Sequence, residues 1–146
     1  MAPNNRGKRS EICIAGLQVE FVVAFLAITS CRGLAAPLNP AYRTEEFNFY
    51  LEDSDSKLMI LPAKPCPHAE ASAASKGVPV ARLTTRAAAS GALTVHLEHS
   101  LRVGPPSRAT ALPADSALLL HTSGTTGRPK AVPLTHANLQ ARPFCS

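Results

Sequence analysis

The spacing of hydrophobic residues divides much of the chain into segments with helical and with strand character. Apolar residues recur at helical spacing in three segments, and short apolar runs bounded by Gly, Pro or polar residues lie between them. Such alternation is typical of an α/β protein with a parallel sheet and helices on its faces. We therefore predict a layered α/β fold. The expected helices cover 17–28, 44–53 and 69–76, and the expected strands cover 34–38, 57–61, 78–83 and 117–120.

The first of these helices has no polar face. Val22, Val23 and Leu26 fill positions that a surface helix leaves polar, so we expect the helix to be buried on nearly all sides. Gly33 follows it and is suited to its C-terminal cap.

The second helix has clear signals at its start. Thr44 is a suitable N-cap, and Glu45 and Glu46 lie in the first turn, where the helix dipole favours acids. Its apolar stripe consists of Phe47, Tyr50 and Leu51. The Asp-Ser-Asp-Ser run at 53–56 lacks the Gly and the distant Glu of a calcium loop, so a solvated helix end is expected there.

The segment 84–113 differs from the rest in its small residues, scattered Arg and Gly-Pro-Pro turn, and we interpret it as a long connection or a variable insert. His96 and His99 lie within it, three residues apart. Without carboxylate or Cys partners nearby, they are interpreted as a surface pair and not as a metal site.

Composition favours a globular protein of 146 residues with room for one domain. Charged residues make up 17% and the net charge is +5, from 15 Lys and Arg against 10 Asp and Glu. Aromatic residues are only 5%, and no basic stripe is interleaved with them, which argues against nucleic-acid binding. Solvated charge together with an anionic ligand accounts for the basic balance.

The four cysteines, at 13, 31, 66 and 145, show neither C-x-x-C spacing nor His at zinc-finger spacing. No zinc site or disulfide framework is expected, which fits a reducing compartment such as the cytoplasm. Basic residues near the N-terminus precede an apolar run at 21–28, but this run is far shorter than a membrane span. We predict neither secretion nor a transmembrane span.

One stretch carries a specific chemistry. Directly after the expected strand at 117–120 come glycines and hydroxyl residues, then Pro129 and Lys130. Glycine lets the backbone approach a ligand closely with its N–H groups pointing at an anion, and hydroxyls and a Lys add donors and positive charge. We predict a loop that binds phosphate. Its candidate residues are Thr122, Ser123, Gly124, Thr125, Thr126, Gly127 and Lys130.

This loop is not a Walker A motif, because its Lys comes three residues after Gly127 and a β-like segment at 131–134 follows. The next helix is therefore expected to begin at Thr135 or beyond. His121 and His136 flank the loop; we interpret His121 as a satisfied strand-end residue and His136 as a residue of the first helical turn, with no direct catalytic role.

The pattern T-S-G-T-T-G-x-P-K followed by V-x-L-T-H resembles the phosphate-binding motif of the acyl-adenylate-forming (AMP-binding) superfamily. The fit is complete from Thr122 to Lys130, with Ala131 in place of the usual Gly. Upstream, the segments 20–28 and 36–61 resemble the 4-coumarate–CoA ligase-like branch, and within it the plant and fungal oxalate–CoA ligase type. The resemblance runs over 17–139 and is weak only across 84–113.

The resemblance implies an ATP-dependent acid–CoA ligase, in which a small carboxylic acid reacts with Mg2+-ATP to give an acyl-adenylate and coenzyme A then displaces AMP. It implies that the loop holds the β- and γ-phosphates and that Lys130 is the catalytic cation. The adenine site, the acid pocket and a further mobile domain of such enzymes lie downstream of this loop. They have no counterpart in the sequence, so we expect an incomplete N-terminal subdomain that is inactive alone.

The expected layout is an N-terminal tail at 1–16, a partial AMP-binding domain at 17–140 and a divergent tail at 141–146. The expected location is cytoplasmic, or peroxisomal for a full-length form. The alternative function is a non-catalytic module that binds a nucleotide or a partner through the same loop.

Overall fold

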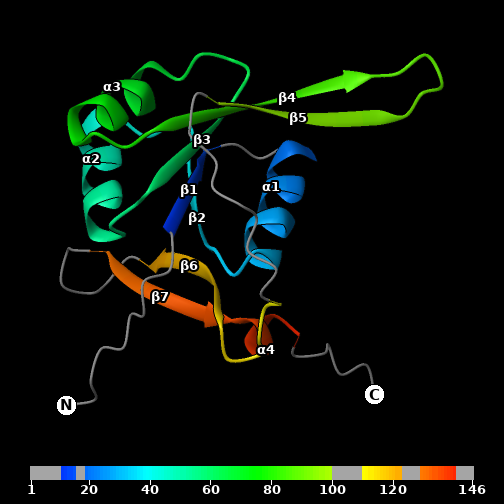
Figure 1. Cartoon of the computed structure of the whole chain (residues 1–146). Coiled ribbons are helices and arrows are strands. Elements are labelled where there is room, and N and C mark those ends of the chain that lie inside the picture. Colours follow the sequence, from blue (N-terminus) through cyan, green and yellow to red (C-terminus); the bar gives the residue numbers. More distant parts are fainter. Residues whose placement is uncertain (1–10, 16–18, 100–109, 123–128, 141–146) are drawn as a thin grey trace.

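The computed structural model describes residues 11–15, 19–99, 110–122 and 129–140. These residues form a seven-stranded sheet in the order β5-β4-β3-β1-β2-β6-β7, with helices against it (Figure 1). The elements are β1 (Glu11–Ala15), α1 (Val19–Ser30), β2 (Leu34–Leu38), α2 (Thr44–Asp53), β3 (Leu58–Pro62), α3 (Pro67–Lys76), β4 (Val80–Ala87), β5 (Leu93–His99), β6 (Ser116–Thr122), β7 (Lys130–Thr135) and α4 (His136–Leu139).

The middle of the sheet is parallel, and both edge strands are antiparallel. β4, β3, β1, β2 and β6 run in the same direction, whereas β5 pairs with β4 and β7 pairs with β6 in the opposite sense. This arrangement confirms the predicted α/β fold. The predicted order of helix and strand from α1 to β4 is also present.

Strand β1 was not predicted, because it lies within the segment assigned to the N-terminal tail. It occupies the centre of the sheet, where Cys13 pairs in register with Ala36 of β2 and with Met59 of β3. Its side chains alternate between the two faces of the sheet, as a strand buried on both sides requires. Cys13 contributes to the core under α2 and α3, and Ile14 to the core under α1.

Helices cover both faces of the sheet (Figure 1). On the α2 and α3 side, the fully buried Phe47 and Met59 form the centre of the core. Ala69 and Ala73 of α3 are also fully buried, and their small side chains let that helix approach the strands closely. On the other side, Ile28 of α1 packs with residues of β1, β2 and β3.

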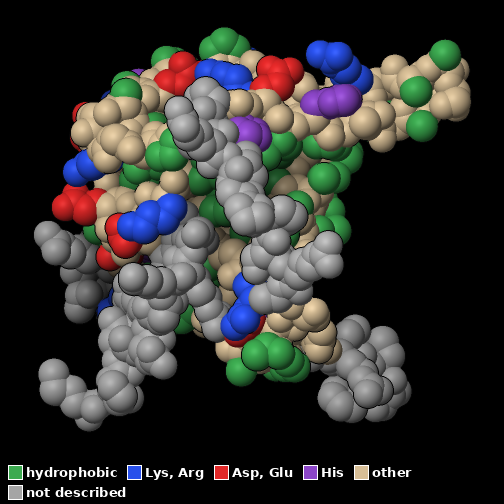
Figure 2. All heavy atoms as spheres, viewed as in Figure 1, with side chains coloured by type: hydrophobic (Ala, Val, Ile, Leu, Met, Phe, Trp, Pro, Cys, Tyr) green, Lys and Arg blue, Asp and Glu red, His purple; other side chains and the backbone are tan. Residues whose placement is uncertain are grey.

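Helix α1 is not buried on all sides, so that prediction was wrong. Val19, Val22, Val23 and Leu26 are between 40% and 56% exposed. A helix contacts a flat sheet along one stripe only, and no described residue covers the opposite side. Hydrophobic side chains accordingly lie at the surface below the β4–β5 hairpin, where α1 lies (Figure 2). No described helix is long and apolar enough to cross a membrane.

The C-terminal cap of α1 uses two residues where one was predicted. Arg32 takes the left-handed conformation, with φ of 61°, and its N–H donates to the Thr29 carbonyl at 3.1 Å. The Gly33 N–H donates to the Ile28 carbonyl at 2.8 Å, which completes a Schellman motif. Gly33 therefore stands one position beyond the left-handed residue. Its role is to leave space.

We expect Gly33→Ala to lower the free energy of unfolding by about 1–3 kcal/mol, as overpacking does in well-packed sites. A Cβ there would lie 2.6 Å from the Ile28 Cγ2 and 2.9 Å from the Ile28 carbonyl oxygen. Gly77 is the matched control, because its φ is +66° and nothing lies within 4 Å of an added Cβ. Asn tolerates the left-handed region, so Gly77→Asn should destabilise the protein less than Gly77→Ala. At Gly33, where space is the limit, Asn should destabilise the protein at least as much as Ala. Urea unfolding that shows Gly33→Ala as stable as wild type would contradict the crowding argument.

Helix α2 begins as predicted to within one residue. Arg43 is the N-cap, with extended backbone, and its N–H donates to the Glu46 carboxylate at 2.9 Å. Thr44, the predicted N-cap, is the first helical residue, and its hydroxyl contacts His68 Nδ1 at 3.0 Å. The predicted apolar stripe is confirmed, since Phe47 and Leu51 are buried.

The segment predicted as a long connection contains regular structure. β4 continues to Ala87 and forms a hairpin with β5, in which Thr84 lies opposite His96. Both His96 and His99 are exposed on the strand, and the described residues contain no cluster of His, Cys, Asp and Glu that could hold a metal. Their interpretation as surface residues is confirmed.

Candidate nucleotide-binding site

The predicted phosphate loop connects the two strands of the β6–β7 hairpin. Thr122, the last residue of β6, lies directly opposite Lys130, the first residue of β7. Both are exposed. The predicted strand before the loop and the β-like segment after it are therefore confirmed. Five candidate residues of the loop itself, Ser123, Gly124, Thr125, Thr126 and Gly127, lie outside the described residues.

Strand β6 is buried on one side only. Ala117 and Leu119 are buried, whereas Leu120 is exposed, so the expectation of a fully buried run at 117–120 holds for alternate residues. Leu119 belongs to the core under α2 and α3, and Ala131 of β7 packs against that core. The register between β2 and β6 rests on a single residue pair, Ala35 opposite Leu118. Side-chain contacts at the two ends of β6 supplement this short pairing.

At the amino end of β6, Asp115 is anchored to the cap of α1. Arg32 Nε lies 2.8 Å and Arg32 Nη2 3.3 Å from the two oxygens of the Asp115 carboxylate. The same carboxylate accepts from the Leu112 N–H at 3.0 Å. The Asp115 side chain is 4% exposed and that of Arg32 is 37% exposed. This forked contact holds the start of β6 against the end of α1.

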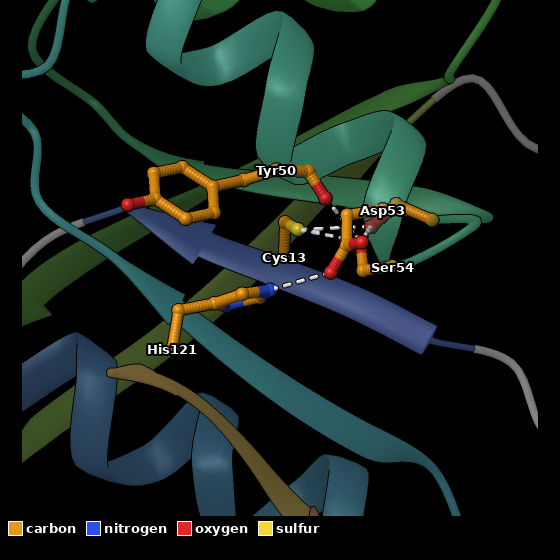
Figure 3. Close-up of polar contacts among 6 residues, drawn as sticks. Cys13, Tyr50, Asp53, Ser54 and His121 are labelled. Carbon is orange, nitrogen blue, oxygen red and sulfur yellow. Dashed lines mark hydrogen bonds and ion pairs between the residues drawn. The ribbon is translucent and has the colours of Figure 1, made fainter. Parts of the chain in front are cut away.

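At the carboxyl end of β6, His121 contacts the last turn of α2 (Figure 3). His121 Nε2 lies 3.0 Å from Asp53 Oδ2, and the imidazole meets the Tyr50 ring edge-on with centroids 4.7 Å apart. The His121 side chain is only 6% exposed. The interpretation of His121 as a satisfied strand-end residue is confirmed. Sequence reasoning missed its partner Asp53, which lies 68 positions away.

The end of α2 is not wholly solvated, so that expectation was wrong. Ser54 and Ser56 are buried, and their hydroxyl oxygens lie 2.6 Å apart. The Ser54 hydroxyl donates to the Tyr50 carbonyl at 2.7 Å, and Cys13 Sγ lies 2.9 Å from the Ser56 hydroxyl (Figure 3). These hydroxyls form hydrogen bonds at the last turn of α2, where the helix lies over β1. This arrangement was not predicted.

Burial raises the pKa of Tyr50 to about 12, and a hydrogen bond with Tyr42 adds to the effect. An acid with a raised pKa in the folded state stabilises the protein below its unfolded value and loses that contribution as the pH rises through the folded value. We therefore expect a loss of stability between pH 10 and about 12, which Tyr50→Phe removes. Phenolate absorbance can follow the titration, since the chain has only 2 tyrosines. A normal Tyr50 titration would contradict the burial of Tyr50 and its hydrogen bond with Tyr42.

Helix α4 begins after β7, as predicted. Thr135 is its N-cap, and its hydroxyl accepts from the Asn138 N–H at 3.2 Å. His136 is the first helical residue, as predicted, and its N–H donates to the Asp115 carbonyl at 2.9 Å. The helix N-terminus therefore lies at the far end of β7 from the loop. The N-terminus of α4 is therefore not placed to add its dipole to the predicted loop.

Together these features define a layered α/β protein in which an edge hairpin presents a Gly- and hydroxyl-rich segment, flanked by an exposed Lys. The chain belongs to the AMP-binding enzyme family, whose model matches residues 7–144.

Similar proteins agree with this assignment. A probable CoA ligase, CCL9, from Humulus lupulus is 44% identical over 122 residues, which are 83% of this chain and 23% of that protein. An oxalate–CoA ligase from Arabidopsis thaliana is 44% identical over 121 residues, 83% of this chain and 24% of that protein. The chain thus spans about a quarter of the length of these curated relatives.

Solved structures give the same fold. The ATP-bound RpMatB-BxBclM chimera is 26% identical with a TM-score of 0.63, and the match covers 90% of this chain and 26% of the chimera. The N-terminal domain of FACL13 from Mycobacterium tuberculosis is 26% identical with a TM-score of 0.61, and the match covers 88% of this chain and 32% of that domain. The fold is therefore that of the N-terminal domain of adenylate-forming enzymes.

Proposed function

We propose that this chain supplies the phosphate-binding part of an ATP-dependent, AMP-forming acid–CoA ligase. In this reaction a carboxylate oxygen attacks the α-phosphorus of ATP, and the bond from the α-phosphorus to the bridging oxygen breaks. Pyrophosphate leaves, and the thiol of coenzyme A then displaces AMP from the acyl-adenylate. Membership of the AMP-binding family and the similarity to CoA ligases support this proposal.

The observation that carries the proposal is the pairing of Thr122 with Lys130 across the mouth of the hairpin. It brings the first hydroxyl and the cation of the motif to the same point, with the connecting residues between them. Negative charge grows on the departing pyrophosphate as the bond breaks. Fixed N–H groups, hydroxyls and a Lys at that point stabilise it without reorganising water.

We assign the β- and γ-phosphates to the hairpin segment. The hydroxyls and amides of Thr122, Ser123, Gly124, Thr125, Thr126 and Gly127 would hold them, and Lys130 would balance their charge. Mg2+ would arrive bound to ATP. The printed activity of the Arabidopsis relative makes oxalate the first acid to test. A cytoplasmic location agrees with the free thiols of Cys31 and Cys66.

The test is ATP–pyrophosphate exchange with oxalate and a panel of other small acids. It should be run on this chain and on a longer form that continues past Leu139, together with Mg-ATP binding to each. Exchange by the longer form would support the ligase. If neither form binds Mg-ATP and neither catalyses exchange, the proposal is overturned.

A second candidate is a non-catalytic nucleotide-binding module. This function is favoured for the chain alone, because the chain spans only about a quarter of the length of each relative. Binding of Mg-ATP without formation of any acyl-adenylate, by both forms, would support the module and exclude the ligase.

A further inference from the structure

Strand β6 carries the predicted phosphate loop and is held at each end by a polar side-chain contact to the end of a helix. Asp115, just before the strand, pairs with Arg32 beyond α1. His121, next to the loop, pairs with Asp53 at the end of α2. Backbone pairing to β2 is limited to one residue pair, so these contacts fix how the strand sits on the sheet.

The pair next to the loop is built from both sides. Tyr50 and Asp53 lie three residues apart on α2 and therefore share one helix face. Both contact the imidazole of His121, Tyr50 with its ring and Asp53 with its carboxylate (Figure 3). The almost complete burial of the His121 side chain leaves it little freedom to turn.

Helix propensity does not explain why an acid stands at Asp53. The C-terminus of a helix carries partial negative charge, so a carboxylate there is unfavourable for the helix itself. The last turn of α2 contains no basic residue to offset it. His121 supplies the compensating donor from another element.

We propose that Asp53 and His121 form a positioning pair that fixes the amino-terminal flank of the phosphate loop for binding nucleotide phosphates. This inference rests on the proposed function. Neighbouring side chains of a strand point to opposite faces, so fixing His121 toward α2 directs Thr122 away from it. Thr122 is indeed exposed, next to Lys130. Neither Asp53 nor His121 is proposed to contact the phosphates; both act through Thr122.

Two substitutions of His121 separate the hydrogen bond to Asp53 from ring packing. His121→Phe keeps an aromatic ring against Tyr50 and removes the donor, whereas His121→Gln keeps a donor at the position of Nε2 and removes the ring. Asp53→Asn removes the charge of the acceptor with little change in shape. Glu52→Gln is the control, since the neighbouring Glu52 pairs with Lys76 on the surface and not with β6.

The first measurement needs no ligand. Hydrogen exchange of the Thr122 and Lys130 amides, followed by NMR in the full chain, should be about tenfold faster in His121→Phe than in wild type. Asp53→Asn should show a smaller increase, and His121→Gln and Glu52→Gln should stay close to wild type. Unchanged hydrogen exchange in both His121→Phe and Asp53→Asn would overturn the proposal that this pair orders the flank.

The second measurement is the Kd of Mg-ATP for the same variants. His121→Phe should weaken binding about tenfold, because a less ordered flank must be ordered when the nucleotide binds, and His121→Gln should restore most of the affinity. A His121→Gln variant as weak as His121→Phe would overturn the role of the donor. If neither wild type nor the longer form binds Mg-ATP, the proposed function fails, and the hydrogen-exchange rates still decide whether the pair orders the flank.

Discussion

Replacing Lys130 with alanine is expected to slow acid-dependent ATP–pyrophosphate exchange by about 10²- to 10³-fold, in the form of the protein that catalyses it. Lys130 is exposed at the mouth of the hairpin, opposite Thr122, where the predicted loop begins and ends. Its charge would act on the departing pyrophosphate, so the loss should be larger in kcat than in KM for ATP. Initial exchange rates over a range of ATP concentrations would measure both.

Two variants show whether the effect belongs to this site. Lys57→Ala removes the same charge from an exposed pair with Asp55 and should leave exchange unchanged. Lys130→Arg keeps the charge but replaces a compact ammonium with a planar fork, so it should recover only part of the rate. Equal rates for wild type and Lys130→Ala would remove Lys130 from the reaction, and with it the assignment of the loop.

The parts of the fold that the sequence predicted are those in which local pattern and burial agree. β2, β3 and α3 each have short apolar or helical patterns bounded by breakers, and each formed where expected. The start of α4 after Thr135 also followed from local signals, since the hydroxyl of an N-cap residue satisfies a nearby N–H.

The parts that were missed depend on contacts between distant segments. β1 has only four apolar residues, after Glu11 and a basic segment, and its central place depends on pairing with β2 and β3. β5 is exposed along most of its length, so burial leaves little pattern in its sequence. The exposure of one side of α1 depends on what covers that helix, which composition cannot show.

The candidate site shows the same division. Its loop was identified from residue types at fixed spacing, because phosphate binding requires glycine, hydroxyls and a cation close together in sequence. The supports of the loop are distant in sequence: Arg32 for Asp115 and Asp53 for His121. A run of acids at the end of α2 gave no sign that one of them would reach β6.

The largest effect on stability is expected at the amino end of β6. Arg32→Ala should lower the free energy of unfolding by about 2–3 kcal/mol, because it removes the cation that contacts both oxygens of the buried Asp115 carboxylate. This value lies below that for a fully buried pair, since the Arg32 side chain is 37% exposed and water can partly replace it. Arg32→Lys keeps the charge but not the forked contact, so its free energy of unfolding should lie between those of wild type and Arg32→Ala.

Urea unfolding at a constant m-value would measure the loss. Lys76→Ala is the matched control: it breaks an exposed pair with Glu52, which is expected to contribute about 0–1 kcal/mol. Combining Arg32→Ala with Asp115→Asn should cost less than the sum of the two single variants, because the two side chains contact each other and each single change already removes that contact. If Arg32→Ala and Lys76→Ala lose the same small amount, the contact is an ordinary surface pair. The backbone pairing of β6 and the His121 contact would then have to hold the hairpin by themselves.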